Sequence, residues 1–449
     1  MEPKSLRNIV ISILLAIGLL AGGWYLTRQV NQRDSYQFSM VTELEIDGNA
    51  EILAATADGK TLLHSNTKRN SIDLIDISNP ARASFIRRVI TPGEPTSVAI
   101  SPDDKWAIAT VYLAADQDEP LYPGALAIID ITEPSEARMT GMIGVGHQPD
   151  SLSVTKSGAS LYAILAIENE PMLRAGEEGE TDVSLPGMVQ IVSFNPERPG
   201  NYRVGTLDLS PARLERAGMQ MIEDPQPEFI AISRDQTVAA ASLQENNGIV
   251  VFDPYTLDIR ATFNVGKVAD RPADLTNDNT INFAERYPRD AEPMGPAGLR
   301  EPDGIAFTPD GKFIVSADEG EAELSGGRGV SLWTIEGEFV WDDGGEIERT
   351  AADMGYYDDG RSSIRGIEIE GVSTASFGGQ DYFFALAERG AFMVIYALNR
   401  NAAPTLVQIL ATETEPEHLI AIPARGLIAV GSEDAGSLRV YRHNATSAP

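Results

Sequence analysis

The most informative segment runs from Glu301 to Gly320 and reads EPDGIAFTPDGKFIVSADEG. It contains two alternating apolar runs on either side of Pro-Asp-Gly at residues 309–311, a pattern typical of a β-hairpin. The same pattern recurs along the chain. Clear copies begin at Glu94, Gln148, Gln226 and Glu415, and weaker copies begin at Asn49 and Ser363. Self-similarity of this kind predicts a repeat architecture with seven units.

Each unit adds further strands to its hairpin. A third run rich in β-branched and aliphatic residues follows the pair, as in SIDLIDIS from Ser71 and GIVVFD from Gly248, and several units add a fourth. Four short antiparallel strands repeated seven times indicate an all-β fold, a seven-bladed β-propeller. A right-handed parallel solenoid is the alternative, but its repeats would be shorter and would lack the regular hairpin turn.

The two ends of the repeat region complement each other. The last unit stops after its third strand, at Tyr441, whereas Phe38–Ile46 alternates like a strand and belongs to no unit. We therefore expect Phe38–Ile46 to supply the outer strand of the seventh blade and close the ring. The predicted propeller domain covers residues 34–449.

Residues 1–33 differ from the rest and predict a membrane anchor with a linker. From Asn8 to Thr27 the chain has 20 residues without a charge. At about 1.5 Å per residue, one helix of this length crosses the roughly 30 Å core of a bilayer. The small residues AGG at positions 21–23 would also suit cleavage, so the segment is either a retained signal anchor or a removed signal peptide. Both alternatives place the propeller outside the cytoplasm, in the periplasm or at the cell surface.

Composition excludes several classes of protein. The chain has 66 Asp and Glu against 35 Lys and Arg, with a formal net charge of −31. Because nucleic-acid binding needs a basic face, this balance argues against nucleic acid as a partner. Cysteine is absent, which excludes disulfide scaffolds, zinc ribbons, iron–sulfur proteins and cysteine hydrolases. A strongly acidic surface instead attracts cations.

Three long insertions separate the regular strands, at residues 168–186, 267–300 and 341–362. In a propeller, the connections between blades and the loops between second and third strands open on the same face. We therefore expect the three insertions to build one rim. This inserted-loop face is the predicted surface for a protein partner.

Acidic residues recur at positions that would face the mouth of the central channel. Inner-strand starts carry Asp150, Glu228, Asp303 and Glu417, and the loops after second strands carry Glu245, Asp318, Glu319, Glu388 and Glu433. Because close carboxylates raise each other's pKa, a hard cation with oxygen ligands would relieve them, and Ca²⁺ is the predicted cofactor. The candidate metal ligands are Glu228, Glu245, Asp303, Asp318, Glu319, Glu388 and Glu417. The alternative is that these acids are solvated or pair with Arg300, Arg365 and Arg389.

A separate segment also has oxygen-bearing side chains at alternating positions. It begins at Asp274 and reads DLTNDNTINF. The spacing is that of a calcium loop, although the segment lacks the glycine and the closing glutamate of an EF-hand.

Basic residues accompany the acids of the predicted mouth. Arg365 and Arg389 occupy positions where neighbouring units carry acids, and His147 directly precedes the third hairpin. Arginine beside a metal suits a phosphate or carboxylate, so these three residues are candidate anion or ligand contacts. Charge balancing is the alternative for the arginines, and a structural role is the alternative for His147. The sequence has no nucleophile elbow, phosphate-binding glycine loop or zinc-binding spacing, so no catalytic residue is assigned.

Several segments resemble a known family. PEFIAISRDQTVAAASLQENNGIVVFD from Pro227 and PDGIAFTPDGKFIVSADEGEAE from Pro302 are similar to the bacterial choice-of-anchor I proteins and to the mesenchyme-specific cell-surface glycoproteins of biomineralising animals. ALAERGAFMVIYAL from Ala385 resembles one of their closing blades. LIDISNP at Leu74 and IIDITEP at Ile128 resemble LVIVD-type and YVTN-type propeller repeats instead.

The resemblance implies an exported or surface-anchored propeller, associated with calcium or phosphate physiology and without a settled reaction. Glu245, Asp318, Glu319 and Glu321 match polar segments of the family. A fainter resemblance links the chain to calcium-dependent phosphoesterase propellers of the phytase and alkaline-phosphatase kinds. One such alkaline-phosphatase family uses a cysteine, which this chain lacks.

Three hypotheses for function therefore remain. The first is a membrane-tethered propeller that binds a ligand or partner through a calcium-associated mouth. The second is a calcium-dependent phosphoesterase, in which metal ions activate water. The third is a purely structural propeller, so whether the protein is an enzyme stays open.

Overall fold

The computed structural model describes residues 37–113, 123–169, 185–287, 298–320, 327–400 and 402–444. The chain divides into two units, one of Met40–Arg442 and the other of Met1–Ser39 with His443–Pro449. In the smaller unit, Ser39 Oγ donates to Asn444 Oδ1 at 3.0 Å. The larger unit contains the repeats.

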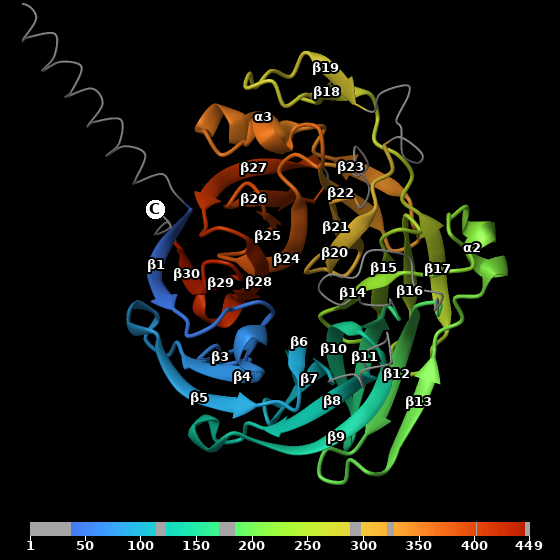
Figure 1. Ribbon diagram of the computed structural model, residues 1–449, viewed down its shortest axis with the longest axis vertical. Helices are drawn as coiled ribbons and strands as arrows, with labels where there is room; N and C mark the ends of the chain where they lie inside the picture. The colour runs from blue at the N-terminus through green and yellow to red at the C-terminus, as the bar shows by residue number, and fades with distance from the viewer. Residues whose placement is uncertain are drawn as a thin grey trace, which may run out of the picture. The chain divides into compact units, whose positions relative to one another are not determined.

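The described residues form seven four-stranded sheets, which are the blades of a β-propeller (Figure 1). This confirms the all-β seven-bladed fold. Blade 1 holds β2 (Leu53–Ala55), β3 (Thr61–Asn66), β4 (Ser71–Asp76) and β5 (Ser84–Ile90). Blade 2 holds β6 (Glu94–Ile100), β7 (Trp106–Tyr112), β8 (Pro123–Asp130) and β9 (Arg138–His147). Blade 3 holds β10 (Pro149–Ser157), β11 (Ser160–Ile167), β12 (Met188–Phe194) and β13 (Tyr202–Thr206).

The other blades repeat this arrangement. Blade 4 holds β14 (Pro227–Ile232), β15 (Ala239–Leu243), β16 (Gly248–Phe252) and β17 (Ile259–Asn264). Blade 5 holds β20 (Pro302–Phe307), β21 (Phe313–Asp318), β22 (Gly329–Thr334) and β23 (Phe339–Asp342). Blade 6 holds β24 (Ile369–Phe377), β25 (Gln380–Ala387), β26 (Phe392–Asn399) and β27 (Ala402–Ala411). Blade 7 holds β28 (Pro416–Ile422), β29 (Leu427–Ser432) and β30 (Ser437–His443), with β1 (Phe38–Glu45) as its outer strand.

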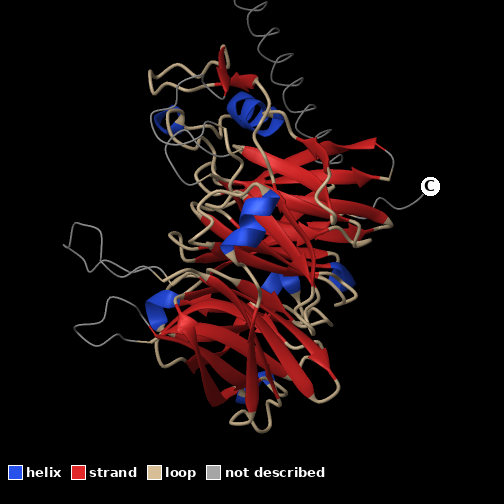
Figure 2. Cartoon of the chain, turned by 90° about the vertical axis from the view of Figure 1, so that its right-hand side faces the viewer, coloured by secondary structure: helices blue, strands red, loops and turns tan. Residues whose placement is uncertain are grey.

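Short helices lie in the connections, where Figure 2 shows them in blue among the strands. The helices are α2 (Pro211–Ala217), α3 (Glu346–Met354), η1 (Thr67–Arg69), η2 (Pro80–Arg82), η3 (Pro134–Glu136), η4 (Asp359–Arg361) and η5 (Pro423–Arg425). A two-stranded sheet of β18 (Arg271–Ala273) and β19 (Glu285–Tyr287) lies in the connection between blades 4 and 5.

The hairpin turn between the first two strands repeats one side-chain contact. A Ser or Thr hydroxyl donates to an Asp two residues later, at 2.7 to 2.9 Å, in Thr56–Asp58, Ser101–Asp103, Ser233–Asp235 and Thr308–Asp310. In the clearest copy, Gly311 adopts a φ of 72°, which glycine tolerates without a steric penalty. These contacts require particular residue types at fixed positions, so the repeated turn can be recognised in the sequence.

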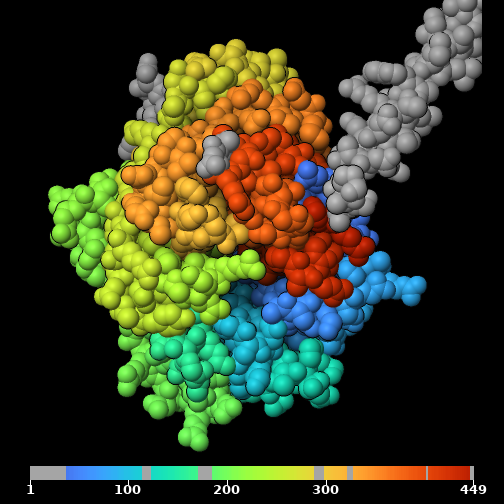
Figure 3. Space-filling model, turned by 180° about the vertical axis from the view of Figure 1, so that it is seen from behind, coloured from blue at the N-terminus to red at the C-terminus, as the bar shows by residue number. Residues whose placement is uncertain are grey.

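The hydrophobic core lies between neighbouring blades. Ile164 and Val189 of blade 3, for example, belong to the same buried cluster as Ala239 and Phe252 of blade 4. The middle strands are therefore covered on both faces, and every residue of β15 and β16 is buried. Seen from behind, the blades follow one another in chain order around the centre (Figure 3).

The predicted insertions 168–186 and 267–300 lie between β11 and β12 and between β17 and β20. The third was predicted to begin at residue 341, but it begins after β23, which ends at Asp342, and it precedes β24. Residues 170–184 of the first insertion lie outside the described residues. The expected transmembrane helix, Asn8–Thr27 within residues 1–33, also lies outside them. No helix in the described part of the chain is both long and apolar enough to cross a bilayer.

Packing between blades predicts a strong effect of truncating Phe252, which is 0% exposed in the cluster shared by blades 3 and 4. We expect Phe252→Ala to lower the free energy of unfolding by about 3–5 kcal/mol, because it removes apolar contacts and leaves a cavity. Urea denaturation of the full-length chain measures this. Phe85→Ala is the matched control, because Phe85 is 55% exposed. Equal losses in the two variants would contradict the assignment of the core.

Candidate functional site

A carboxylate lies at the start of the inner strand in most blades. Asp150, Glu228, Asp303, Glu370 and Glu417 are each the second residue of an inner strand, and Glu51 lies just before the inner strand of blade 1. All six side chains are half-buried. In blade 2 the corresponding position holds Thr96, whose hydroxyl donates to Pro149 O at 2.6 Å. We call these six acidic residues the inner ring.

A bulge accompanies five members of the inner ring. The pairing of first and second strands shifts register between Pro149 and Leu152, Pro227 and Ile230, Pro302 and Ile305, Ile369 and Val372, and Pro416 and His418. A β-bulge leaves a residue outside the regular pairing and redirects its side chain. Gly304 allows blade 6 to approach, since a Cβ there would lie only 2.4 Å from Glu370 O.

Further acids follow the second strands directly. Glu168, Glu319, Glu388 and Glu433 occupy this position in blades 3, 5, 6 and 7. In blade 4 the position holds Gln244, whose Nε2 donates to Glu319 Oε2 at 2.9 Å. Glu245, the residue predicted from the sequence, is one position further on and half-buried.

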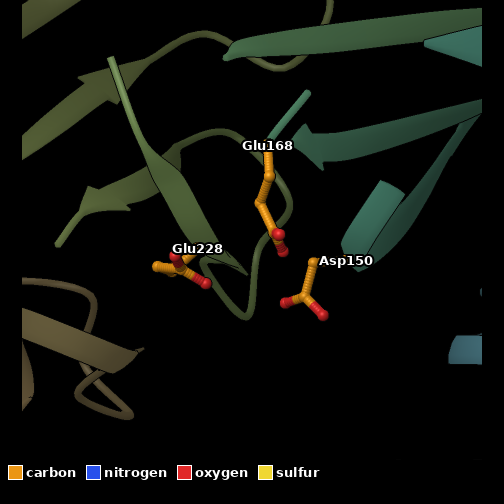
Figure 4. A group of neighbouring side chains, drawn as sticks. All are labelled: Asp150, Glu168 and Glu228. Carbon is orange, nitrogen blue, oxygen red and sulfur yellow. The ribbon is translucent and has the colours of Figure 1, made fainter. Parts of the chain in front are cut away.

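Two groups of three carboxylates result. In the first, Asp150, Glu168 and Glu228 each offer an oxygen atom within 4.8 Å of the others, and Figure 4 shows the three side chains converging. In the second, Glu370, Glu388 and Glu417 do the same. Asp150 and Glu228 form no ion pair with a described lysine or arginine. Each group therefore has the oxygen donors that a hard divalent cation prefers.

Burial raises the pKa of the inner-ring carboxyl groups. Burial raises the pKa of Asp150 to about 7. Burial and neighbouring carboxylates together raise the pKa of Glu417 to about 8 and that of Glu51 to about 9. The pKa values of Glu228, Asp303 and Glu370 are also raised well above their usual range, by burial first and then by nearby acids.

Carboxyl groups of different blades raise one another's pKa. Asp150 of blade 3 raises the pKa of Asp303 in blade 5 and of Glu417 in blade 7. The inner ring is therefore one electrostatic unit, in which ionising one group disfavours ionising the others.

The two candidate arginines are held by carboxylates near blades 5 to 7. Arg365 pairs with Glu319 and, at 3.0 Å, with Glu368. Arg389 pairs with Glu388 at 3.1 Å and also with Glu415. Both guanidinium groups thus balance acids around the second carboxylate group.

Asp318 has a different setting from the rest of the predicted ligands. It is 1% exposed, accepts a hydrogen bond from Arg300 Nη1 at 3.0 Å, and accepts another from Ser316 at 2.7 Å. Ser331 also donates to its carboxylate. These partners make Asp318 part of a buried network inside blade 5. Glu321 lies outside the described residues.

Two histidines were predicted or found near the channel, His418 on an inner strand and His147 on an outer strand. His418 Nδ1 accepts the N–H of Leu53 at 3.2 Å, and burial lowers the pKa of His418 to about 4. Its ring stacks on Phe229, with centroids 6.4 Å apart, and both side chains line a cavity of about 440 Å³ that Asp150 also lines. His147 ends the outer strand β9, and its N–H donates to Asn169 Oδ1 at 3.2 Å. The structure therefore associates His418, not His147, with the channel.

Sequence reasoning missed Glu51, Glu370 and Glu168 as candidate ligands. Glu51 and Glu370 lie in the two weaker copies of the repeat, which lack the proline before the acid. Only the alignment of the blades in the structure shows that both residues occupy the position of the other inner-ring acids. Glu168 was assigned to the first position of an insertion. For this reason its place directly after β11 was not recognised from the sequence.

Solved structures share this architecture. A chain of Kuenenia stuttgartiensis hydrazine synthase has a TM-score of 0.55 and 14% identity, covering 90% of this chain and 99% of that one. A chain of a mitotic checkpoint complex has a TM-score of 0.55 and 11% identity, covering 91% and 96%. A β-propeller domain from Myceliophteria thermophila has a TM-score of 0.55 and 10% identity, covering 91% and 100%. At such identities the likeness concerns the fold alone.

Comparison with sequences identifies the family. No curated protein sequence matches the chain significantly. The model of the choice-of-anchor I domain matches residues 51–323 and 322–401, which confirms the resemblance seen in the repeats. The matched residues run from Glu51 in the first blade to β26 in the sixth and include most of the inner ring, so the chain belongs to the choice-of-anchor I domain family.

Proposed function

We propose that this chain is an exported, membrane-tethered β-propeller that binds Ca²⁺ at the channel mouth and presents a calcium-dependent surface to a ligand or partner. One observation carries the proposal. The mouth holds two groups of three carboxylates, and within each group the candidate oxygen atoms lie within 4.8 Å of one another.

The energetics of the inner ring favour a bound cation. Six half-buried carboxyl groups with raised pKa values cannot all ionise at neutral pH without strong mutual repulsion. A divalent cation stabilises the ionised forms, so binding and deprotonation are coupled. Calcium suits the site because it accepts six to eight oxygen ligands in flexible geometry.

The arginines favour binding over phosphoester hydrolysis. Arg365 and Arg389 are held by Glu319, Glu368 and Glu388, among other carboxylates. A phosphoryl group would have to displace these carboxylates before it met either guanidinium. These ion pairs therefore favour a role for the two arginines in balancing negative charge near the second carboxylate group.

The proposed partner surface is the face that carries the insertions. Acids that follow the second strands, such as Glu168, lie where loops of this face begin. Calcium at the mouth would neutralise part of the negative charge where these loops begin, which makes partner binding depend on the cation.

The first prediction concerns calcium affinity. Glu228→Gln and Glu417→Gln remove one carboxylate from the first and second group, respectively. We expect each variant to weaken calcium binding about tenfold or more, because carboxylate charge sets the affinity of such sites. Isothermal titration of the metal-stripped full-length chain measures this.

Glu136→Gln is the control for these titrations, because Glu136 is exposed on η3, away from both carboxylate groups. It should bind calcium as the unaltered chain does. Absence of saturable binding at millimolar calcium, or equal affinity in all variants, would contradict the calcium proposal.

The second prediction concerns pH. The pKa values of Asp150, Glu417 and Glu51 are raised from 3.8 or 4.5 to about 7, 8 and 9. The folded state therefore holds these protons more tightly than the unfolded state does, and stability must fall as pH rises from about 4 to about 9. We expect the melting temperature of the calcium-free chain to drop over this range, and calcium to reduce the drop.

Calorimetric melting curves at several pH values, with calcium or with a chelator, test this. Glu417→Gln should flatten the slope in the calcium-free chain. A calcium-free melting temperature that stays constant or rises over this range would show that the inner ring is not under electrostatic strain.

The third prediction concerns the tether. We expect the full-length chain to sediment with membranes and to require detergent for release, whereas a chain that starts at Asp34 should remain in the soluble fraction. The physical reason is the uncharged stretch of 20 residues from Asn8 to Thr27. Equal partitioning of the two chains would contradict membrane tethering.

A further inference from the structure

Two insertions that are distant in sequence lie side by side. The loop after β18, residues 274–284, comes from the connection between blades 4 and 5, and η4 comes from the next connection. Asn277 Nδ2 donates to Gly360 O at 2.9 Å, and Ser363 N donates to Asn277 Oδ1 at 2.8 Å. In Figure 1 the hairpin of β18 and β19 lies beside α3, which comes from the same connection as η4. We call this contact the insertion junction.

A buried carboxylate faces this junction with an unused oxygen atom. Asp274 is 0% exposed. Its Oδ2 accepts the N–H of Asn282 at 3.3 Å, whereas its Oδ1 is buried without a hydrogen-bond partner. Leaving an ionised oxygen buried and unpaired is costly, so the position calls for a positively charged ligand.

A second carboxylate of the junction, that of Asp359, also has an oxygen atom without a hydrogen-bond partner. Asp359 Oδ2 accepts the N–H of Asn279 at 2.7 Å, and Asp359 Oδ1 is buried without a partner. The charge of Asp359 contributes to raising the pKa of Asp274, although burial is the main cause. The two carboxylates therefore interact directly with each other's charge.

The nearest arginine does not compensate these charges. Arg328, which is fully buried, donates to the backbone oxygen of Asp274 at 3.2 Å. Glu348 balances the charge of Arg328, because Arg328 Nη2 and Glu348 Oε1 form an ion pair at 2.8 Å. Both side chains of this pair are fully buried. Among the described residues, neither Asp274 nor Asp359 forms an ion pair with a lysine or arginine. Neither carboxylate is therefore balanced by a lysine or arginine of the described chain.

We propose that the insertion junction is a second calcium site, in which Asp274 and Asp359 bind one Ca²⁺ through their unpaired Oδ1 atoms. The Ser362 hydroxyl and the amide of Thr276 lie close enough to Asp274 to lower its pKa, which shows that polar groups of both insertions surround the carboxylate. Neutral oxygens of these segments and water complete a coordination shell of the size that calcium prefers. The cation then links the two insertions, and this link does not depend on calcium binding at the channel mouth.

The experiment uses terbium, which replaces Ca²⁺ and luminesces when a nearby tyrosine is excited. Tyr357 is suitably placed, because its hydroxyl lies 3.5 Å from Asp274 O. Tyr112 lies near the mouth carboxylates, which help to raise its pKa. The full-length chain with both Glu228→Gln and Glu417→Gln is therefore the background, because binding at the mouth is weakened there and the signal of the junction dominates.

In this background we expect saturable luminescence that calcium displaces. Asp274→Asn and Asp359→Asn should each lower the terbium affinity at least tenfold, and Tyr357→Phe should lower the intensity without a comparable loss of calcium affinity. Asp353→Asn, an exposed acid at the end of α3, is the matched control and should change neither quantity. If Asp274→Asn fails to fold, Asp359→Asn still tests the site, because Asp359 is only half-buried.

Failure of this proposal differs from failure of the mouth proposal. Luminescence and calcium affinity that are unchanged by both junction variants, or absent from the mouth-deficient background, would overturn the junction site. Loss of calcium binding at the mouth with the junction signal intact would leave this site standing and remove only the mouth.

Discussion

The packing of each sheet against two neighbours is the constraint on which the structure depends. The middle strands lie between neighbouring blades, so most of their residues are apolar and buried, as in β15 and β16. Because no blade can bury these faces alone, the ring is stable only when every blade has a neighbour on each side. The outer position of β1 beside β30 joins the N-terminal and C-terminal parts of the repeat region in one sheet.

Ring packing also determines the chemistry at the axis. All inner strands start at the same end of the channel, so a residue type repeated at that position is brought together from every blade. Here the repeated residue is acidic in six blades. The β-bulges at these positions free the side chains from the regular pairing. The resulting repulsion is tolerated because the cores between blades supply the stability elsewhere.

The acidic mouth is not electrically uniform. Arg365 and Arg389 balance acids near blades 5 to 7, and Glu368 lies between them with only 1% of its side chain exposed. The histidine that reaches the channel, His418, is held neutral by burial and stacked on Phe229. The same physical principle applies at the insertion junction, where Arg328 is occupied by Glu348 and leaves two carboxylates uncompensated.

The sequence alone determined the fold and part of the mouth. Alternating hydrophobicity, turn chemistry and the repeated acid after proline are properties of neighbouring residues, so they were legible in EPDGIAF and its copies. Asp150, Glu228, Asp303 and Glu417 followed from that pattern. Glu51 and Glu370 occupy the same position, but their copies of the repeat are too weak to reveal it without the aligned blades.

Only the tertiary structure decided which acids pair with arginines. Asp318 matched the pattern of a mouth ligand, yet its carboxylate is bound by Arg300 and Ser331 within blade 5. The insertions that carry Asp274 and Asp359 meet through contacts such as Asn279 N to Asp359 Oδ2, and their sequences carry no signal of this contact. Local periodicity specifies strands and turns, whereas the partner of a charged side chain depends on which distant segments the closed ring brings into contact.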